Sequence, residues 1–365
     1  MRVLLLGGTG RFGSITARRL VAADVVSEVA IAGRSPDRLT RAVSELGEKA
    51  RTVQVDLRDE ERLAFIAADY DIVVNTAGPE WEVLLAGLRG AIAAGRHYCD
   101  IGADGATAET QLQLDSIAKE RDVVAVVGMG LDPGLSNLLA VRASRQFDRV
   151  EEVQLCYRMA PSELLSEALD QLRTANRIDP SWQLALNVAK GPVRVYRTGR
   201  WIDVVPQEHG VEITPPEGGS VWAYPVATPE PITLPRHLPP LVEDARGYLS
   251  RFGLEDVGGR NRAERQAAGA LHVLAHARAT RHDNSSDRCH PPDHTGRGFC
   301  ARRPPARGVL RADALLRGNG SVREGGRSRQ AFVRRIAGVA LLIQEGGLRR
   351  KLVSESGFAG GDEGI

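Results

Sequence analysis

The first thirteen residues of the chain constrain its fold more than any other stretch. The apolar run Val3-Leu-Leu-Leu6 predicts a buried strand, and the motif Gly8-x-Gly10-x-x-Gly13 then opens a helix that continues through Leu20. A strand, a glycine-rich turn and a helix in this order are typical of a dinucleotide-binding domain. We therefore predict a phosphate-binding loop at the start of the chain.

Each glycine of this motif has an expected role. Gly8 permits the tight turn, Gly10 lets backbone N–H groups approach a pyrophosphate, and Gly13 lets the helix pack closely on the strand. The N-terminus of the helix directs a positive dipole toward the phosphates. The residues between the glycines belong to the same predicted cofactor site: Thr9, Arg11 and Phe12.

Strand and helix patterns alternate up to residue 149, which predicts an α/β fold with a doubly wound parallel sheet of the Rossmann type. In the strand order 3-2-1-4-5-6, the first and fourth strands flank the point where the order reverses, and their carboxyl ends form the crevice that binds the cofactor. The predicted strands cover 29–34, 52–56, 71–75, 97–102 and 123–128, and the predicted helices cover 36–48, 81–94, 106–121 and 135–145.

The end of the second strand indicates which dinucleotide binds. An NAD site places Asp or Glu there to accept hydrogen bonds from the ribose hydroxyls. This chain instead has Gly33-Arg34-Ser35, and a guanidinium with a hydroxyl beside it suits a 2′-phosphate. The sequence therefore predicts NADP(H) as the cofactor, with Arg34 and Ser35 in its site. The alternative is that Arg34 is a solvated loop arginine.

Two later strand ends supply the other predicted cofactor contacts. Asp56 ends the third strand, where it either borders the adenine pocket or caps the next helix. After the fourth strand come small residues, as expected where the chain passes close to a ligand, and Pro79 is suited to begin a helix. The predicted contacts in this stretch are Asn75, Ala77, Gly78 and Pro79.

A second helix N-terminus is predicted at the same crevice. The turn at 129–134 precedes the helical pattern of 135–145, with Asp132 suited to the N-cap and Pro133 to the first helical position. The backbone N–H groups of such a helix are able to hold a substrate carboxylate or the nicotinamide amide. The alternative is a helix cap without a ligand.

Residues 150–257 are predicted to form a second, mixed α+β domain with an antiparallel sheet that closes over the crevice and binds the substrate. Thr198-Gly199 between two short strand patterns indicates a hairpin. Dense proline between residues 206 and 240 predicts loops and edge strands. The strand patterns cover 153–158, 193–196, 201–205 and 221–224, and a helical pattern covers 162–175.

The third region, residues 258–365, does not resemble a folded domain. Between 278 and 330 it is rich in arginine, contains no lysine and shows little apolar periodicity, so it buries too little surface to offset its ordering entropy. Three explanations are open: a natural disordered tail, a segment that binds nucleic acid electrostatically, or a reading-frame error in a GC-rich gene. The abrupt change in composition favours the reading-frame error.

Global composition excludes several classes of protein. The net charge is +2, the chain is 42% hydrophobic and 26% charged, and no apolar run reaches the roughly eighteen residues of a membrane span. The four cysteines are scattered and predict no disulfide framework. The chain begins directly on a core strand without a charged leader. We expect a cytoplasmic protein that acts on a small-molecule substrate, without a membrane partner.

Two histidine patterns are set aside as metal sites. Cys289-His290-x-x-x-His294 followed by Cys300 matches no common zinc-finger spacing. His272 and His276 lie one helical turn apart, but the glutamate of a zinc-protease helix is absent. The arginine-rich region also lacks the interleaved aromatic residues that stack on bases. We therefore predict neither a metal nor a nucleic-acid partner.

Four motifs in this order resemble the saccharopine dehydrogenase family, and most closely its shorter bacterial members, which include saccharopine reductases and carboxynorspermidine synthases. The motifs are Gly7-Gly-Thr-Gly-Arg-Phe-Gly13, Asn75-Thr-Ala-Gly-Pro79, Tyr98-Cys-Asp-Ile-Gly102 and Gly130-Leu-Asp-Pro-Gly-Leu-Ser-Asn137. The resemblance covers about residues 1–245 and fails beyond about 258. It implies NADPH-dependent reduction of an imine formed from an amine and a semialdehyde, or the reverse reaction, and a homodimer formed through the second domain.

The resemblance directs attention to acid–base groups at the strand ends that face the crevice. The candidates are Tyr98, Asp100 and Asp132, and Cys99 is a candidate for lining the pocket. The alternative is that Tyr98 and Asp100 only satisfy the strand-to-loop transition. Substrate carboxylates would require arginines of the second domain, for which the candidates are Arg158, Arg177 and Arg194.

A non-catalytic function also stays open. A dinucleotide-binding domain is able to serve as a sensor of the NADP(H) redox state without catalysis. The additional sheet-forming domain and the Asp132-Pro133-Gly134 turn favour an enzyme, because a sensor needs no site for a second substrate.

Overall fold

The structure is a computed structural model that describes residues 1–144, 150, 152–157, 180–189, 191–213, 220–237 and 244–250. These residues fall into two compact units. The first contains Met1–Leu135 together with helix α9 (Pro180–Val188), and the second begins at Ser136 and contains the other described elements. The predicted domain boundaries at 149/150 and 257/258 stay predictions. The helical pattern of 162–175, the arginine-rich region and its Cys and His residues lie outside the described residues.

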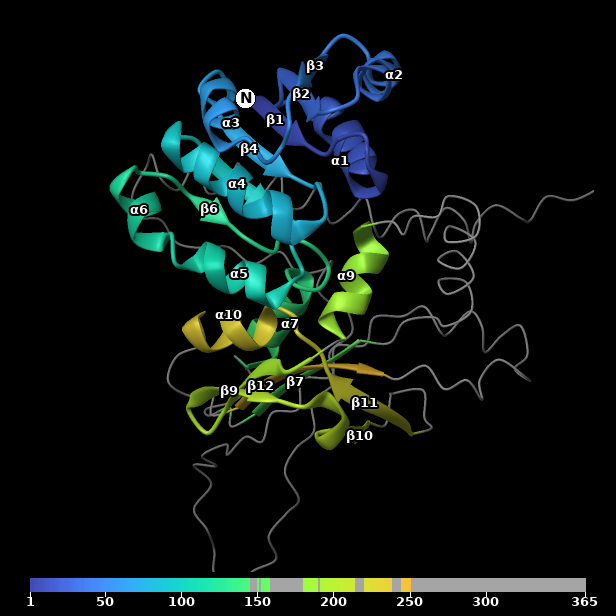
Figure 1. Cartoon of the computed structure of the whole chain (residues 1–365), viewed down its shortest axis with the longest axis vertical. Helices are drawn as coiled ribbons and strands as arrows, with labels where there is room; N and C mark the ends of the chain where they lie inside the picture. Colours follow the sequence, from blue (N-terminus) through green and yellow to red (C-terminus); the bar gives the residue numbers. More distant parts are fainter. Residues whose placement is uncertain are drawn as a thin grey trace, which may run out of the picture. The chain divides into compact units, whose positions relative to one another are not determined.

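The first unit contains a parallel sheet of six strands in the order β3-β2-β1-β4-β5-β6 (Figure 1). Each neighbouring pair in this sheet is parallel. This confirms the predicted α/β fold with a doubly wound Rossmann-type sheet and its strand order. The strands are β1 (Arg2–Leu6), β2 (Glu28–Gly33), β3 (Ala50–Gln54), β4 (Ile72–Asn75), β5 (His97–Asp100) and β6 (Ala125–Val126).

Helices cover both faces of this sheet, which explains why its central strands are continuous apolar runs. Because side chains alternate along a strand, Val3 and Leu5 of β1 pack on one face and Leu4 and Leu6 on the other. Helices α1 and α2 cover the first face, and α3 and α4 cover the second (Figure 1). The helices are α1 (Arg11–Val21), α2 (Pro36–Leu46), α3 (Glu60–Ala67), α4 (Glu80–Ala93), α5 (Gly105–Leu112) and α6 (Asp115–Glu120).

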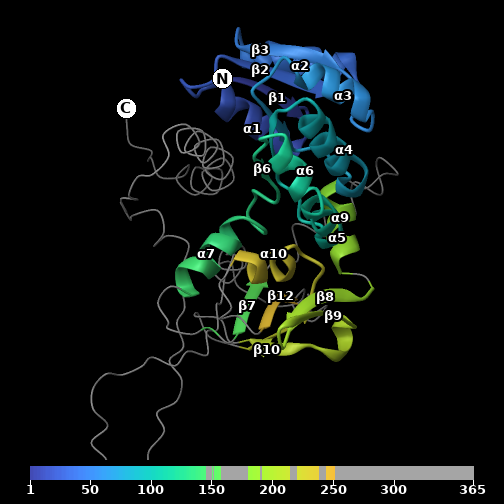
Figure 2. The same ribbon diagram turned by 90° about the vertical axis from the view of Figure 1, so that its left-hand side faces the viewer.

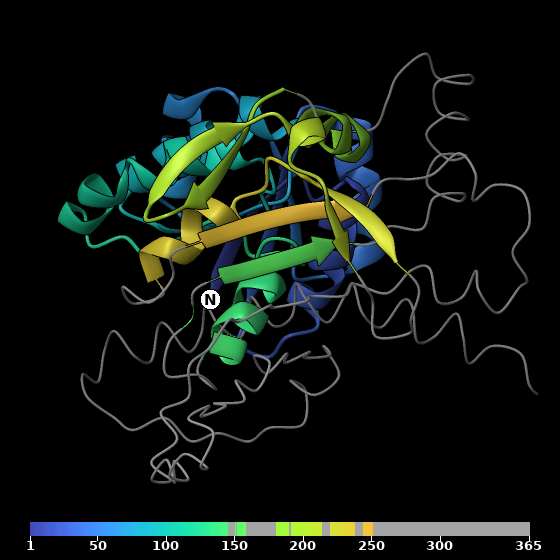
Figure 3. The ribbon, with the colours of Figure 1, turned by 90° about the horizontal axis from the view of Figure 1, so that it is seen from below.

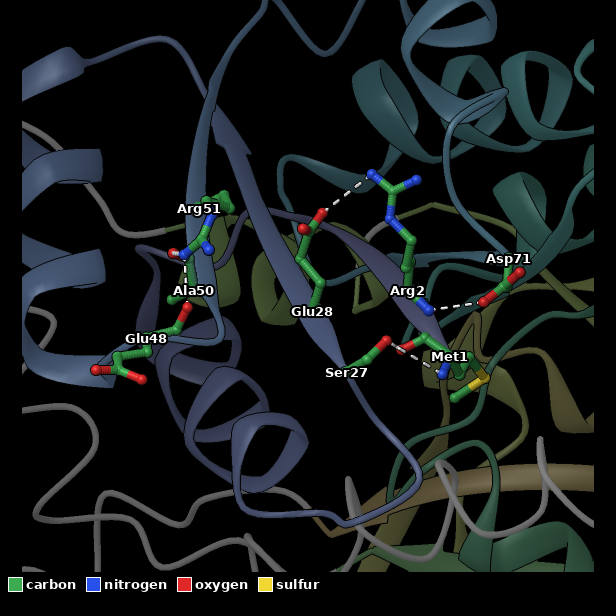
Figure 4. Close-up of polar contacts among 8 residues, drawn as sticks. All are labelled: Met1, Arg2, Ser27, Glu28, Glu48, Ala50, Arg51 and Asp71. Carbon is green, nitrogen blue, oxygen red and sulfur yellow. Dashed lines mark hydrogen bonds and ion pairs between the residues drawn. The ribbon is translucent and has the colours of Figure 1, made fainter.

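Polar contacts connect the amino ends of the strands (Figure 4). The N–H of Arg2 donates to Oδ2 of Asp71 at 2.6 Å, and its guanidinium lies 3.3 Å from Oε1 of Glu28. The N-terminal ammonium of Met1 donates to Oγ of Ser27 at 3.4 Å. The ion pair between Arg2 and Glu28 is exposed to solvent, so it contributes little to stability. These polar groups lie at the amino ends of the strands, whereas the glycine-rich loop lies at the carboxyl end of β1.

The last part of this unit differs from the sequence prediction in two places. The predicted helix at 106–121 is divided into α5 and α6, because Leu114 between them has a ψ of 5°, outside the helical range. The predicted strand at 123–128 is reduced to the two residues of β6. Gly128 has a φ of +69°, and its N–H donates to the carboxylate of Asp100 instead of a neighbouring strand.

The second unit contains a mixed sheet in the order β10-β11-β12-β8-β9, with β7 paired to β12. Figure 2 shows these strands below helices α7 and α10, and Figure 3 shows β7 and β12 side by side as parallel arrows. The other described pairs are antiparallel, as predicted. The strands are β7 (Glu152–Tyr157), β8 (Val193–Arg197), β9 (Arg200–Val204), β10 (Val211–Ile213), β11 (Val221–Pro225) and β12 (Asp244–Ser250).

The predicted hairpin is confirmed between β8 and β9. Thr198 and Gly199 both have positive φ, +49° and +76°, as a two-residue turn of this hand requires. The predicted loops of the proline-dense stretch are wrong at one place, since helix α10 spans Glu230–His237. Pro231 lies in the first turn of α10, where a missing N–H removes no hydrogen bond of the helix.

Helices α7 (Leu135–Ser144) and α10 are joined within the second unit by buried side chains. The hydroxyl of Ser136 donates to Oε1 of Glu230 at 2.7 Å, and Nδ2 of Asn137 donates to the hydroxyl of Thr233 at 2.9 Å. Ser136 and Glu230 are both fully buried. A hydrogen bond to a buried carboxylate is stronger than a neutral one, so this contact fixes the two helices against each other.

Candidate functional site

The glycine-rich loop lies at the carboxyl end of β1, against the loop that follows β4. Gly7 has a φ of +78°, and a Cβ atom at this position would come within 2.7 Å of the backbone of Ala77. The left-handed residue of the turn is thus Gly7, and not Gly8 as the glycine spacing predicts. Gly8 is required for a different reason, since a Cβ there would lie 2.7 Å from Cγ2 of Ile31.

The expected role of Gly13 in close helix packing is supported by the structure. A side chain at Gly13 would overlap the carbonyl oxygen of Gly7 and lie 2.7 Å from Oγ1 of Thr76. Gly10 is the N-cap of α1, and a Cβ atom there would lie 3.2 Å from the oxygen of Gly7. A larger residue at Gly13 would therefore force the start of α1 away from β1, and one at Gly10 would crowd the loop.

The start of α1 has the properties of an anion-binding helix end. Its N-cap makes no side-chain hydrogen bond, and no acidic residue occupies its first turn. The first N–H groups of a helix have no partner within the helix, and the helix dipole favours negative charge at this end. Arg11 and Phe12 of this turn are exposed, and Thr9 is partly buried. The loop thus fits the phosphates of a dinucleotide.

Arg34 and Ser35 are exposed at the carboxyl end of β2. Ser35 is the N-cap of α2, but its side chain makes no capping hydrogen bond. The backbone oxygen of Arg34 accepts a hydrogen bond from Nε2 of Gln54 at 3.4 Å. Both predicted residues therefore present their polar groups at the edge of the sheet where the glycine-rich loop also lies.

The structure adds a residue that the sequence analysis missed, Arg38 in the first turn of α2. Its Nη2 atom donates to the carbonyl oxygen of Thr9 in the glycine-rich loop at 2.9 Å. The sequence contains one signal for this residue. Arg38 follows Arg34 by four residues, which is about one helical turn, so the two positive charges can lie on the same side.

Asp56 is engaged by a neighbouring arginine. Oδ1 of Asp56 accepts from Nε of Arg58 at 3.1 Å, and Oδ2 accepts from Nη2 at 2.7 Å. These hydrogen bonds lower the pKa of Asp56 to about 2. The N-cap of α3 is Asp59, which accepts from the N–H of Arg62 at 2.9 Å. Of the two alternatives for Asp56, the helix-cap interpretation is therefore wrong, and the adenine-pocket role stays a prediction.

The loop after β4 is shaped by Asn75, whose side chain is fully buried. Its Nδ2 donates to the carbonyl of Val83 at 3.2 Å, and its Oδ1 accepts from the N–H of Ala77 at 3.1 Å. This arrangement holds Ala77 against Gly7, while Gly78 is exposed and Pro79 directly precedes α4. The predicted cofactor contacts of these residues stay predictions, and the observed role of the Asn75 side chain is to fix the loop.

Tyr98 and Asp100 point into the protein, where they hold the ends of the strands. The hydroxyl of Tyr98 donates to the carbonyl of Leu84 at 3.1 Å. The carboxylate of Asp100 accepts from the N–H groups of Gly102 and Gly128 at 3.0 and 2.8 Å and from Nε2 of Gln111 at 2.7 Å.

Full burial raises the pKa of both Tyr98 and Asp100. Cys99, on the other face of the strand, is also fully buried, and burial raises the pKa of its thiol. Buried in this way, these side chains offer no surface to a substrate. The observed contacts correspond to the strand-to-loop alternative, and the acid–base roles of Tyr98 and Asp100 and the pocket-lining role of Cys99 stay untested predictions.

Glu80, the first residue of α4, is a second residue that the sequence analysis missed. Its Oε2 accepts from the N–H groups of Ala103 and Asp104 at 2.7 and 2.8 Å. Burial raises its pKa to about 7, and the carboxylates of Asp100 and Asp104 act in the same direction. The two N–H groups oppose this shift but do not cancel it. Glu80 therefore changes protonation near neutral pH.

The turn that contains Asp132 differs from the predicted helix cap. The N–H of Gly130 donates to the carbonyl of Pro133 at 2.9 Å, and the N–H of Leu135 donates to Gly130 at 3.1 Å. Gly134 has a φ of +120°, and helix α7 begins only at Leu135. Asp132 and Pro133 therefore lie in a closed turn before the helix. Asp132 is partly exposed.

One of the three arginines proposed for substrate carboxylates is described by the structure. Arg194 of β8 lies in an exposed ion pair with Asp203 of β9, with Nε 2.9 Å from Oδ1. Arg158 and Arg177 lie outside the described residues. Within the described part of the chain, no three His, Cys, Asp or Glu side chains gather in a way that could hold a metal ion. The described helices also include none with the length and apolar character of a membrane span.

Comparison with known proteins identifies the first domain. Residues 3–126 match the family model described as the saccharopine dehydrogenase NADP binding domain. The match confirms the resemblance found in the sequence and NADP(H) as the cofactor of this domain.

Two curated relatives match short parts of the chain. A trans-acting enoyl reductase of Mycobacterium tuberculosis is 34% identical over 102 residues, which cover 27% of this chain and 24% of that protein. An NADP-dependent 3-hydroxy acid dehydrogenase of Salmonella typhi is 40% identical over 85 residues, which cover 21% of this chain and 34% of that protein. The chain thus spans about a quarter to a third of the length of these relatives.

Among solved structures, the chain is similar to saccharopine dehydrogenase (L-Glu forming) of Saccharomyces cerevisiae. The TM-score is 0.46 at 17% identity, with 69% of this chain and 55% of that chain covered. It is also similar to the WlbA dehydrogenase of Thermus thermophilus, with a TM-score of 0.42 at 11% identity and coverage of 75% and 80%.

Proposed function

Because residues 3–126 of this chain match the family model of the saccharopine dehydrogenase NADP binding domain, we propose that the chain is an NADP(H)-dependent oxidoreductase that reduces an imine to a secondary amine, or catalyses the reverse. The imine forms from the amine of an amino acid or diamine and the aldehyde of a semialdehyde. The proposed site includes the glycine-rich loop, the Asn75–Pro79 loop, and the polar groups of Arg34 and Ser35.

The observation that carries this proposal is the close packing of the two loops that follow β1 and β4. Ala77 lies directly against Gly7, and Thr76 donates to the carbonyl of Leu6 through both its N–H and its hydroxyl, each at 2.9 Å. The two loops therefore pack against each other without a gap at the carboxyl ends of β1 and β4. Donors at this edge, from the start of α1 and from the end of β2, suit an anionic dinucleotide with a 2′-phosphate.

When bound, NADPH supplies the hydride for the imine carbon. The residues of the chain then have two tasks, which are to hold the imine carbon beside the nicotinamide and to exchange a proton at the imine nitrogen. We assign the proton exchange to Asp132, because it is the one of the three predicted acid–base groups that is partly exposed. Asp100 then acts as a positioning residue, since its hydrogen bond to Gly128 orients the segment that leads into the Asp132 turn.

The direct test is consumption of NADPH by the purified full chain, followed by its absorbance. The substrates are semialdehydes, each paired with glutamate or a diamine. Turnover that requires both the amine and the aldehyde supports imine reduction, whereas turnover with an aldehyde alone would refute it. Asp132→Asn is the matched variant, and we expect it to reduce turnover while NADPH binding is retained.

A second candidate is reduction of a carbon–carbon double bond, which the 34% identity to the mycobacterial enoyl reductase supports over 102 residues. The hydride donor is the same, and the acceptor is an enoyl thioester. Adding a short-chain enoyl thioester to the panel distinguishes the two, since only this candidate predicts turnover without an amine. If NADPH binds with saturation but no substrate turns over, the non-catalytic sensor is favoured instead.

A further inference from the structure

Arg38 is the residue from which more can be inferred about cofactor choice. It occupies the first turn of α2, three residues after the N-cap Ser35, and its side chain is exposed. A positive charge is unfavourable at this end of a helix, where the dipole favours acidic residues. Local preferences are most often violated where a residue serves a function.

The guanidinium of Arg38 is held over the glycine-rich loop. Nη2 donates to the carbonyl of Thr9 at 2.9 Å, across 29 positions of sequence. A guanidinium has five N–H donors in a fixed plane, so one hydrogen bond orients the group and leaves other donors for a ligand. The contact thus places a second positive charge at the edge of the sheet where Arg34 and Ser35 lie.

Arg58, which follows β3 near this end of the sheet, is already engaged. Both ends of the Arg58 guanidinium fork bind the carboxylate of Asp56, at 3.1 and 2.7 Å. This exposed ion pair neutralises the charge of Arg58. Between the end of β2 and the first turn of α2, the positive charge for an anion comes from Arg34 and Arg38, with the acidic Asp37 exposed in the same turn of α2. Arg11 is exposed at the start of α1, beside the glycine-rich loop.

We propose that Arg38 is a specificity-determining residue that binds the 2′-phosphate of NADP(H) together with Arg34 and Ser35. Its hydrogen bond to Thr9 sets the guanidinium in place before the cofactor arrives. The doubly charged 2′-phosphate of NADP(H) would thereby bind two guanidinium groups and a hydroxyl. The 2′-hydroxyl of NAD(H) carries no charge for the two guanidinium groups to bind. This inference rests on the proposed cofactor site but not on the proposed reaction.

The test compares the affinities for NADPH and NADH of the full chain with those of Arg38→Met, by isothermal titration calorimetry. Methionine keeps an unbranched apolar stem but removes the charge and the hydrogen bond. Arg41→Met is the matched control, because Arg41 is exposed in the next turn of the same helix. The pair 2′-AMP and 5′-AMP serves as a second probe, since these nucleotides differ in the position of the phosphate and both lack the pyrophosphate.

We expect Arg38→Met to raise the dissociation constant for NADPH about tenfold or more, as for the loss of a hydrogen bond to a charged group. The dissociation constant for NADH should change less than about twofold, and Arg41→Met should change neither by more than this. Likewise, 2′-AMP should lose affinity in Arg38→Met and 5′-AMP should not.

A purely structural role for Arg38 predicts a different change in the two cofactor affinities. If Arg38 only supports the glycine-rich loop through Thr9, both cofactors lose affinity equally, because both place their pyrophosphate on that loop. Equal losses, or an unchanged ratio of the two affinities, would overturn the proposal. Absence of NADPH binding by the unmodified chain would instead refute the proposed cofactor site itself, so the two failures are distinguishable.

Discussion

Replacing Glu80 with glutamine should remove a large part of the pH dependence of stability of this protein. The carboxyl group is partly buried, its Oε2 accepts from two N–H groups of the segment that begins α5, and its pKa rises from the ordinary value of 4.5 to about 7. Glutamine has the same shape and keeps a carbonyl oxygen for the two N–H groups. The variant therefore changes the ionisation and little else.

The sign of the effect follows from linkage. The folded state binds the proton of Glu80 more tightly than the unfolded state does, so this group contributes its full stabilisation below pH 4.5. The contribution is lost as the pH rises through the folded pKa of about 7, and is constant above it. Each tenfold difference in proton affinity is worth about 1.4 kcal/mol, so the interval from 4.5 to about 7 corresponds to about 3 kcal/mol.

The measurement is the free energy of unfolding by urea, followed by tryptophan fluorescence, between about pH 4.5 and 8. The quantity of interest is the difference between the unmodified chain and Glu80→Gln at each pH. Other groups, including the buried Asp100 with its raised pKa, titrate in both proteins, so their contributions largely cancel in this difference. We expect the unmodified chain to lose about 3 kcal/mol relative to the variant across this range.

Glu82→Gln is the control, since Glu82 lies in the same first turn of α4 but is exposed. It should leave the shape of the pH profile unchanged. Parallel profiles for Glu80→Gln and the unmodified chain would refute the reasoning, because they would mean that the Glu80 carboxyl has the same pKa folded and unfolded. Titration of the Glu80 carboxyl carbon by NMR gives the folded pKa directly.

Three further substitutions test other parts of the site. Arg34→Ala should weaken NADPH binding about tenfold or more and change NADH binding little, by the loss of a charged hydrogen bond; equal losses in a fluorescence titration would contradict the 2′-phosphate role. Asp100→Asn should lower the free energy of unfolding by about 1–3 kcal/mol, because an amide cannot accept all three hydrogen bonds of the buried carboxylate; an unchanged urea midpoint would be inconsistent with this. Gly13→Ala should abolish NADPH binding, since its methyl group would overlap the Gly7 carbonyl, and calorimetry showing normal affinity would disprove the packing argument.

Local patterns in the sequence were sufficient for the architecture. The glycine spacing and the apolar runs predicted the strands of the parallel sheet, and the strand order typical of this type of fold gave their arrangement, in which β1 pairs with the distant β4. Thr198-Gly199 predicted the hairpin between β8 and β9, because a hairpin turn depends on residues that are close in sequence. Local signals failed where tertiary contacts overrode them. Gly128 ends β6 early by donating to Asp100, and the prolines of α10 occur in a helix that packs against buried neighbours.

The properties of individual site residues were decided by the tertiary structure. The motif around Tyr98 and Asp100 predicts acid–base groups, but the fold buries both side chains. No local sequence pattern shows how deeply the end of a strand is buried. Burial raises the pKa of Glu80, whose carboxyl group accepts from N–H groups 23 and 24 residues away, and Arg38 reaches Thr9 across 29 residues. The periodicity of a sequence indicates which face of a helix or strand is apolar. The desolvation and hydrogen bonding of an ionisable side chain depend instead on which distant segments the fold brings to that face. The sequence by itself therefore determined the sheet, the glycine-rich loop and the type of cofactor, and the packing of distant loops determined which side chains remain exposed and how they ionise.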